Sequence, residues 1–279
     1  MSQTKHQIEA LLAEAGSQPR QRFGQNFMID QNLVRLVAEA GELGPQDLVI
    51  EVGPGTGTLT EELLARAGQV LAVEIDRDLA ALLRSRFADR PNFKLIEGDA
   101  LAGKHQLNAE LLDELRVARQ AGRSSKLVAN LPYNIASPLV IELLIAGVDL
   151  LAFTVQREVA QRLRASPGTE EYGGLTVMAQ LLSRVEVLRS MPPQAFWPAP
   201  KIESALVRMK RDDRLGQRAA RFGSFVQSIF SYRRKTLRKA LSMAGLDAER
   251  ILATAGVDPQ SRPEVFSPQE VLTMFQAIE

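Results

Sequence analysis

Short apolar runs alternate with amphipathic segments along the chain as far as Val155. The apolar runs have the length of strands, whereas the segments between them carry apolar residues at helical spacing. The runs that predict strands are Leu48–Val52, Val70–Ile75, Phe93–Gly98, Lys126–Asn130 and Leu150–Val155. The segments that predict helices are Thr4–Ala15, Asp30–Ala40, Thr58–Ala67, Asp78–Ala88 and Pro138–Ala146. This alternation predicts an α/β fold with a Rossmann-like, doubly wound, mostly parallel sheet.

Later parts of the chain depart from this alternation. The polar segment Gly103–Ser125 contains one predicted helix, Ala109–Arg119, and is interpreted as a surface insertion. After a last predicted strand, Ile202–Met209, only helical periodicity remains. We therefore expect a larger domain at 1–211 and a small all-helical domain at 212–279.

The composition excludes several kinds of site. The 279 residues include no cysteine, so disulfide frameworks and thiolate metal sites are excluded. The two histidines, His6 and His105, lie far apart in polar surroundings, so no metal site is expected. No apolar signal core or membrane-length run occurs, so a cytoplasmic protein without a membrane segment is expected.

Charge is distributed unevenly along the chain. Residues 201–240 carry 12 Lys/Arg and 3 Asp/Glu, a net charge of +9, against −8 for the remainder. Such a basic block indicates a polyanion-binding segment, and a solvated helix face is the alternative. Its densest part contains basic residues spaced four apart, which places them on one side of a helix. These residues are Arg233, Arg234, Lys235, Arg238 and Lys239.

A glycine turn follows the first predicted strand of the sheet. Gly53, Gly55 and Gly57 form G-x-G-x-G, which differs from the G-x-G-x-x-G fingerprint of dinucleotide sites. Glycines at this point let the backbone approach a nucleotide-like ligand closely. Alone, the turn is also compatible with an ordinary tight turn or an NAD site.

Acidic residues at the next two strand ends refine this interpretation. Glu74 can accept both ribose hydroxyls of an adenosyl group, and we favour it over Asp76, which is a natural helix N-cap. Asp99 follows the third strand and can accept from an adenine amine, or it is simply a turn residue. Because no second phosphate-binding feature follows, S-adenosylmethionine fits the pattern better than NAD.

The tetrapeptide Asn130-Leu131-Pro132-Tyr133 ends another predicted strand. An aromatic amine is a poor nucleophile because its lone pair is delocalised into the ring. The side-chain oxygen of Asn130 and the carbonyl of Leu131, held by the stiff Pro132, offer two acceptors for the amine hydrogens. Tyr133 offers a face for stacking of a base that has left its helix. Together with the cofactor features, these residues predict methyl transfer to a nucleobase.

Over nearly its whole length the chain resembles the bacterial small-subunit ribosomal RNA adenine N6,N6-dimethyltransferases, a group of class I methyltransferases. Several ordered segments carry the resemblance. They are Arg22–Phe27, Glu51–Thr60, Ala72–Asp78, Asn130–Ile135, Gln156–Ala160, Tyr172-Gly173, Phe196–Ser204 and Arg233–Arg238. Met28 and Ala136 depart from the usual leucine and serine, and both departures are expected to be tolerated.

The resemblance implies roles for individual residues. Asn26 and the backbone of Met28, from a predicted loop at Pro19–Ile29, would help to close over S-adenosylmethionine. The residues that complete the implied cofactor site are Gly53, Gly55, Glu74, Asp99 and Asn130. Phe196 would form a second aromatic wall for the flipped adenine opposite Tyr133, and the alternative is a loop anchor packed beneath prolines. Trp197 is expected to have a packing role.

The implied activity is dimethylation of two adjacent adenosines near the 3′ end of small-subunit ribosomal RNA. The implied partner is the immature small subunit, contacted through Arg233–Lys239, and a monomer is expected. One rival is the macrolide-resistance type of enzyme, which modifies large-subunit RNA and commonly has isoleucine where this chain has Leu131. Another is a non-catalytic RNA-binding assembly factor that keeps a vestigial pocket.

Overall fold

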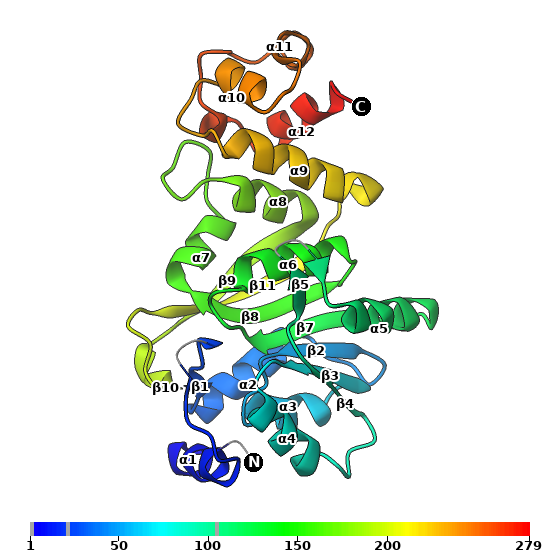
Figure 1. Cartoon of the computed structure of the whole chain (residues 1–279), viewed down its shortest axis with the longest axis vertical. Helices are drawn as coiled ribbons and strands as arrows, with labels where there is room; N and C mark the ends of the chain where they lie inside the picture. The colour runs from blue at the N-terminus through cyan, green and yellow to red at the C-terminus, as the bar shows by residue number, and fades with distance from the viewer. Residues whose placement is uncertain (1–2, 21–22, 104–105) are drawn as a thin grey trace. The chain divides into compact units, whose positions relative to one another are not determined.

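The computed structural model describes residues 3–20, 23–103 and 106–279, which form two compact units (Figure 1). Arg22 and His105, which entered the sequence analysis, lie outside the described residues. The first unit runs to Arg157 and includes Glu186–Lys210, and the second comprises Glu158–Val185 and Arg211–Glu279. A break near residue 211 was expected, but residues 158–185 belong with the C-terminal helices. The reason is that α8 (Gly174–Leu182) packs against α9 (Ala219–Phe230) and α12 (Pro268–Gln276).

A seven-stranded sheet organises the first unit, in the order β4-β3-β2-β7-β8-β11-β9. Neighbours from β4 to β8 are parallel, and β11 runs antiparallel to β8. The strands are β2 (Leu48–Val52), β3 (Gln69–Glu74), β4 (Phe93–Glu97), β7 (Ser125–Asn130), β8 (Leu150–Gln156), β9 (Ser183–Met191) and β11 (Ser204–Arg211). The predicted doubly wound, mostly parallel sheet is confirmed.

Helices cover the sheet, which explains why its central strands read as continuous apolar runs. Every residue of β2 is buried, as are the first six residues of β8. Val37 of α2 and Leu63 of α3 belong to the core on one face, together with Val49 of β2. The helices of this unit are α1 (Lys5–Glu14), α2 (Gln31–Ala40), α3 (Thr58–Leu64), α4 (Arg77–Arg86), α5 (Ala109–Gln120) and α6 (Ala136–Ile145).

Two segments differ from their predicted structure. Across the start of the segment interpreted as a surface insertion, β5 (Leu101–Gly103) pairs antiparallel with β6 (Gln106–Leu107), and α5 follows. Because α5 buries Leu111 and Leu115 and contacts β7, it is a covering helix of the fold. The predicted loop before α2 contains β1 (Phe27–Met28), which pairs with β10 (Phe196–Trp197).

The second unit is helical, apart from short connecting segments. Its helices are α7 (Arg157–Leu163), α8 (Gly174–Leu182), α9 (Ala219–Phe230), α10 (Leu237–Met243), α11 (Ala248–Ala255) and α12 (Pro268–Gln276). Phe222 and Phe225 of α9 contact Phe275 of α12, with ring centroids 5.3 and 5.6 Å apart. Buried Tyr172 donates a hydrogen bond to the Phe266 carbonyl, 2.7 Å away. None of the helices in the described ranges is long and apolar enough to cross a membrane.

Candidate functional site

A pocket lies at the carboxyl ends of β2, β3, β4 and β7, where an open parallel sheet usually binds its ligand. The polypeptide before α2 lines its other side. Every residue that the sequence analysis assigned to the cofactor lines this pocket: Asn26, Met28, Gly53, Gly55, Glu74, Asp99 and Asn130. Pro132 also lines it, whereas Leu131, Tyr133 and Phe196 do not. The fold thus brings together segments that are more than a hundred residues apart in the chain.

The glycine turn forms the floor of the pocket with bare backbone. Gly53 and Gly55 have φ angles of +73° and +61°, in a backbone region that residues with a side chain rarely adopt. A Cβ atom on Gly53 would lie 3.2 Å from Pro132, and one on Gly55 would lie 2.9 Å from the Phe27 ring. Both the backbone conformation and the close neighbours therefore require glycine, as expected where a ligand approaches the main chain.

Glu74 is buried at the end of β3, where backbone amides hold both of its oxygens. The Gly55 N–H donates to Oε2 at 3.1 Å, and the Asp76 N–H donates to Oε1 at 2.9 Å. Burial raises the pKa of Glu74 to about 7, against the smaller lowering effect of these amides. A carboxylate fixed in this way presents its remaining lone pairs to the pocket, which suits recognition of paired hydroxyls.

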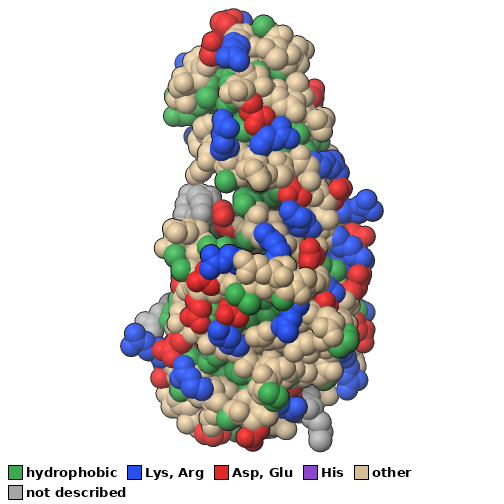
Figure 2. All heavy atoms as spheres, turned by 90° about the vertical axis from the view of Figure 1, so that its right-hand side faces the viewer, with side chains coloured by type: hydrophobic (Ala, Val, Ile, Leu, Met, Phe, Trp, Pro, Cys, Tyr) green, Lys and Arg blue, Asp and Glu red, His purple; other side chains and the backbone are tan. Residues whose placement is uncertain are grey.

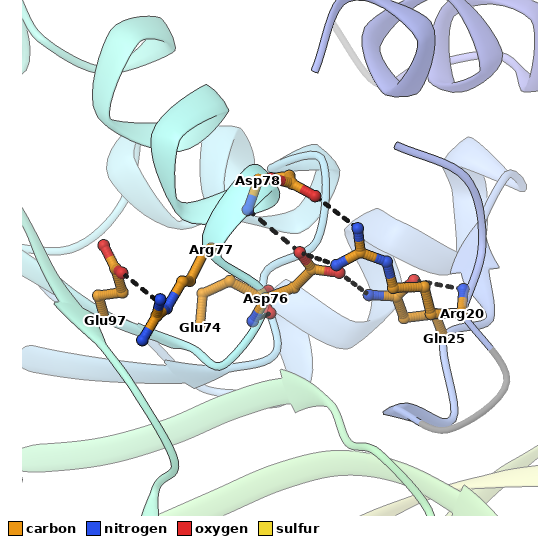
Figure 3. A network of polar contacts seen from close by, with 7 residues as sticks. All are labelled: Arg20, Gln25, Glu74, Asp76, Arg77, Asp78 and Glu97. Carbon is orange, nitrogen blue, oxygen red and sulfur yellow. Dashed lines mark hydrogen bonds and ion pairs between the residues drawn. The ribbon is translucent and has the colours of Figure 1, made fainter. Parts of the chain in front are cut away.

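Asp76, the competing acid, is occupied elsewhere. Its side chain caps α4 through the Asp78 N–H at 3.1 Å and accepts from Arg20 at 2.7 Å and Gln25 at 3.2 Å (Figure 3). Arg20 also pairs with the Asp78 carboxylate at 2.5 Å. Asp76 therefore fastens the segment before β1 to the start of α4, and the geometry favours Glu74 as the ligand-facing acid.

Glu51, for which the sequence predicted no role, is a buried acid in the otherwise apolar strand β2. It lines the pocket, and the Thr60 hydroxyl donates to its Oε2 at 2.6 Å. Burial, helped by the charge of Glu74, raises the pKa of Glu51 to about 8, against the lowering effect of the Thr60 hydrogen bond. The signal was present in the sequence, because Glu51 interrupts an apolar strand immediately before the glycine turn.

Asp99 lines the pocket and also stabilises its own turn. One carboxylate oxygen accepts from the Leu101 N–H at 2.9 Å, and Asn108 donates to the Asp99 carbonyl at 3.0 Å. The side chain is exposed, so its second oxygen is accessible to a ligand. Both interpretations offered by the sequence, a ligand contact and a turn residue, are compatible with this position.

Asn130 is held in one orientation by two neighbours. Its Nδ2 donates to the Asn26 carbonyl at 2.7 Å, and its Oδ1 accepts from the Thr154 hydroxyl. Tyr133 is partly buried, and its hydroxyl lies 2.7 Å from the Ser204 hydroxyl. The amide oxygen thus has a defined position at the edge of the pocket, with one lone pair left for a further donor.

Phe196 lies away from the pocket in this structure. Its side chain is 2% exposed and belongs to the same core as Leu33 and Met191, and its backbone pairs with Met28. This position agrees with the alternative of a loop anchor, and a role as an aromatic wall stays a prediction. Trp197 packs near Phe27, with ring centroids 6.4 Å apart, as expected for a packing residue.

The five basic residues predicted to bind RNA are exposed in the second unit: Arg233, Arg234, Lys235, Arg238 and Lys239. Of these, Arg238 and Lys239 lie on α10, whereas the other three lie in the turn before it, so the predicted placement of all five on one helix is wrong. Arg238 pairs with Glu249, and no salt bridge among the described residues involves the other four. Over the face shown in Figure 2, Lys and Arg side chains are interspersed with Asp and Glu. The described residues contain no group of histidine and acidic side chains suited to a metal ion.

Comparison with known proteins agrees with this geometry. A family model described as ribosomal RNA adenine dimethylase matches residues 16–279. A Magnetococcus marinus protein named ribosomal RNA small subunit methyltransferase A is 44% identical over 93% of this chain and 92% of its own length. Its namesake from Moorella thermoacetica is 38% identical, with 97% and 96% covered. A crystal structure of 23S rRNA methyltransferase ErmE shares 29% identity and a TM-score of 0.62, with 90% and 99% covered.

Proposed function

This chain belongs to the ribosomal RNA adenine dimethylase family, and from that premise we propose that it dimethylates N6 of adenosines in small-subunit ribosomal RNA. The substrate positions are two adjacent adenosines near the 3′ end. The relatives named small subunit methyltransferase A are 38% and 44% identical to it, against 29% for the large-subunit enzyme. This difference supports the small-subunit assignment.

The observation that carries the proposal is the fixed amide of Asn130 at the edge of the pocket. An exocyclic amine that donates to its Oδ1 and to the Leu131 carbonyl is drawn toward a pyramidal geometry, which localises the nitrogen lone pair. Both hydrogens are then aimed at acceptors while the lone pair points away from them. No base is needed before the transfer, because the amine proton becomes acidic once nitrogen is alkylated.

The pocket residues fit S-adenosylmethionine, whose sulfonium would supply the methyl group. Glu74 would accept from the ribose hydroxyls, the bare glycine turn would lie against the nucleoside, and Asp99 would accept from the adenine amine. Asn26 and Met28 would close the pocket from the segment fastened by Arg20. The main contribution of the protein is therefore positioning of two reactants.

The partner we propose is the immature small subunit, met by a monomer in the cytoplasm. The exposed basic segment Arg233–Lys239 supports this, because neutralisation of phosphates by Lys and Arg releases counterions. Tyr133 would stack on an adenine that has left its helix, at a cost of a few kcal/mol for unstacking. This arrangement assigns recognition of the RNA and of the cofactor to separate parts of the chain.

The test is to incubate the protein with labelled cofactor and small subunits that lack the modification, and then to map the modified bases. We expect N6,N6-dimethyladenosine at two adjacent positions near the 3′ end. Asn130→Ala should transfer little label even at saturating cofactor. Label confined to large-subunit RNA would favour the macrolide-resistance activity, and binding of subunits without transfer would favour the assembly-factor function. Either result would overturn the proposal.

A further inference from the structure

We infer that two buried hydroxyls, those of Thr154 and Ser204, are positioning residues that hold Asn130 and Tyr133 in their working orientations. The inference rests on the proposed function. Neither residue lines the pocket, and neither was assigned a role from the sequence. Both are 0% exposed, and they lie on adjacent strands, β8 and β11.

Thr154 is placed by strand register. β7 and β8 are parallel, and Asn130 at the end of β7 lies opposite Thr154. The Thr154 hydroxyl donates to Asn130 Oδ1, while the Asn26 carbonyl accepts from Asn130 Nδ2 at 2.7 Å. A hydroxyl without exposed surface needs a protein partner, and Asn130 supplies it. The contact with the Asn26 carbonyl, which can only accept, distinguishes the nitrogen of the amide from the oxygen.

The orientation of this amide matters for the reaction. Oxygen and nitrogen of an asparagine side chain exchange places by a 180° turn about one bond, with little change in shape. In the turned orientation the amide would present N–H donors to the substrate amine, which is itself a donor. The Asn26 carbonyl opposes that turn because it can only accept, and the Thr154 hydroxyl fixes the position of the oxygen by donating to it.

Ser204 supports the other end of the tetrapeptide. Its hydroxyl lies 2.7 Å from the Tyr133 hydroxyl, at the start of β11. A tyrosine ring can rotate about two side-chain bonds, so a contact at its far end limits the tilt of the ring. Thr154 and Ser204 thus hold the amine-binding amide and the proposed stacking ring from one sheet.

The decisive variant is Thr154→Val, which keeps the shape of the side chain and removes the hydroxyl. Asn130 Oδ1 then lacks its buried donor, so we expect kcat to fall about tenfold, as for loss of one hydrogen bond. Affinity for S-adenosylmethionine and KM for the small subunit should stay within about twofold. Thr154→Ser restores the hydroxyl and should recover most of the rate. If Thr154 had only a structural role, both variants would be less stable, and kcat would not fall selectively while KM stays unchanged.

A matched control is Ser183→Ala, which removes another buried hydroxyl. That hydroxyl donates to the Ala179 carbonyl at 2.8 Å in the second unit, and Ser183 does not line the pocket. The Ser183→Ala variant should be less stable than the native protein, with an unchanged kcat. For Ser204, a double-mutant cycle with Tyr133→Phe is informative, because Ser204→Ala should have little further effect on kcat once the tyrosine hydroxyl is gone.

A second readout does not depend on activity. The side-chain amide signals of Asn130 in a ¹H–¹⁵N spectrum are identified by their loss in Asn130→Asp. In the native protein they should form one sharp pair, and in Thr154→Val they should shift and broaden. An unchanged pair and an unchanged kcat in Thr154→Val would overturn the inference. If the native protein transfers no methyl group, the proposed function fails, and the spectrum still decides whether Thr154 holds Asn130.

Discussion

Proton-linked binding of the cofactor is the prediction that follows most directly from the pocket. Burial raises the pKa of Glu74 to about 7, so near neutral pH a large share of the free protein carries Glu74 protonated. Ribose hydroxyls donate hydrogen bonds, and they bind an ionised carboxylate more strongly than a protonated one. Ligand binding should therefore release a proton from Glu74.

The size of the pH effect on cofactor affinity follows from the pKa of Glu74. With a pKa of about 7, Glu74 is ionised in roughly one tenth of the free protein at about pH 6 and in roughly nine tenths at about pH 8. If only the ionised form binds, the apparent affinity should rise about tenfold over this range, or about 1.4 kcal/mol. Glu74→Gln should bind roughly 10- to 100-fold more weakly at the upper pH, because a charged acceptor is lost.

The assay is calorimetry with 5′-methylthioadenosine, which keeps the adenine, ribose and sulfur but lacks the amino-acid group that titrates in this range. Titrations at about pH 7 in two buffers of different ionisation enthalpy give the number of protons released. Glu51→Gln is the matched control, since it removes the neighbouring buried acid and leaves Glu74. A flat affinity profile for the native protein, or an unchanged slope in Glu74→Gln, would refute the reasoning.

Three further predictions test other parts of the structure. Because burial raises the pKa of Glu51 from 4.5 to about 8, its contribution to stability is full below the lower value and is lost as pH rises through the higher one. The melting temperature of Glu51→Gln should therefore fall less than that of the native protein between about pH 5 and 8. Gly57→Ala should lose about 1–3 kcal/mol in urea unfolding, because its φ is +83° and a Cβ would meet the Phe87 ring at 2.7 Å. Arg234→Glu with Lys235→Glu should weaken subunit binding and flatten its log–log salt slope by about two, with cofactor affinity intact; an unchanged salt titration would show that this segment is a solvated face.

Much of the pocket could be predicted because its residues follow local rules. The apolar runs determine the strands, and parallel strands collect their carboxyl ends at one edge of the sheet. Residues at three successive strand ends, Gly53, Glu74 and Asp99, therefore had to meet. Asp76 was recognisable as an N-cap because a capping side chain acts within its own turn.

The sequence did not reveal β9 or the place of α7 and α8. β9 is an edge strand whose residues are mostly half-buried or exposed, so it lacks the continuous apolar run of the central strands. Helices α7 and α8 precede β9 in the chain but pack with the C-terminal helices. Because this packing joins distant segments, the local sequence of α7 and α8 does not indicate it. The contact of α5 with β7 is likewise between separate segments, so the sequence did not predict that α5 is a covering helix of the fold.

Burial and hydrogen bonding at the site were also decided by tertiary structure. Phe196 is buried because β10 pairs with β1, and Met28 and Phe196 are far apart in sequence. Thr154 reaches Asn130 only through the register of β7 and β8, and a shift of one residue would turn its side chain to the other face. Sequence alone thus determined which chemical groups gather at the sheet edge, because strand ends and turns are local. Which side chains hold those groups in position depended on pairing between distant segments.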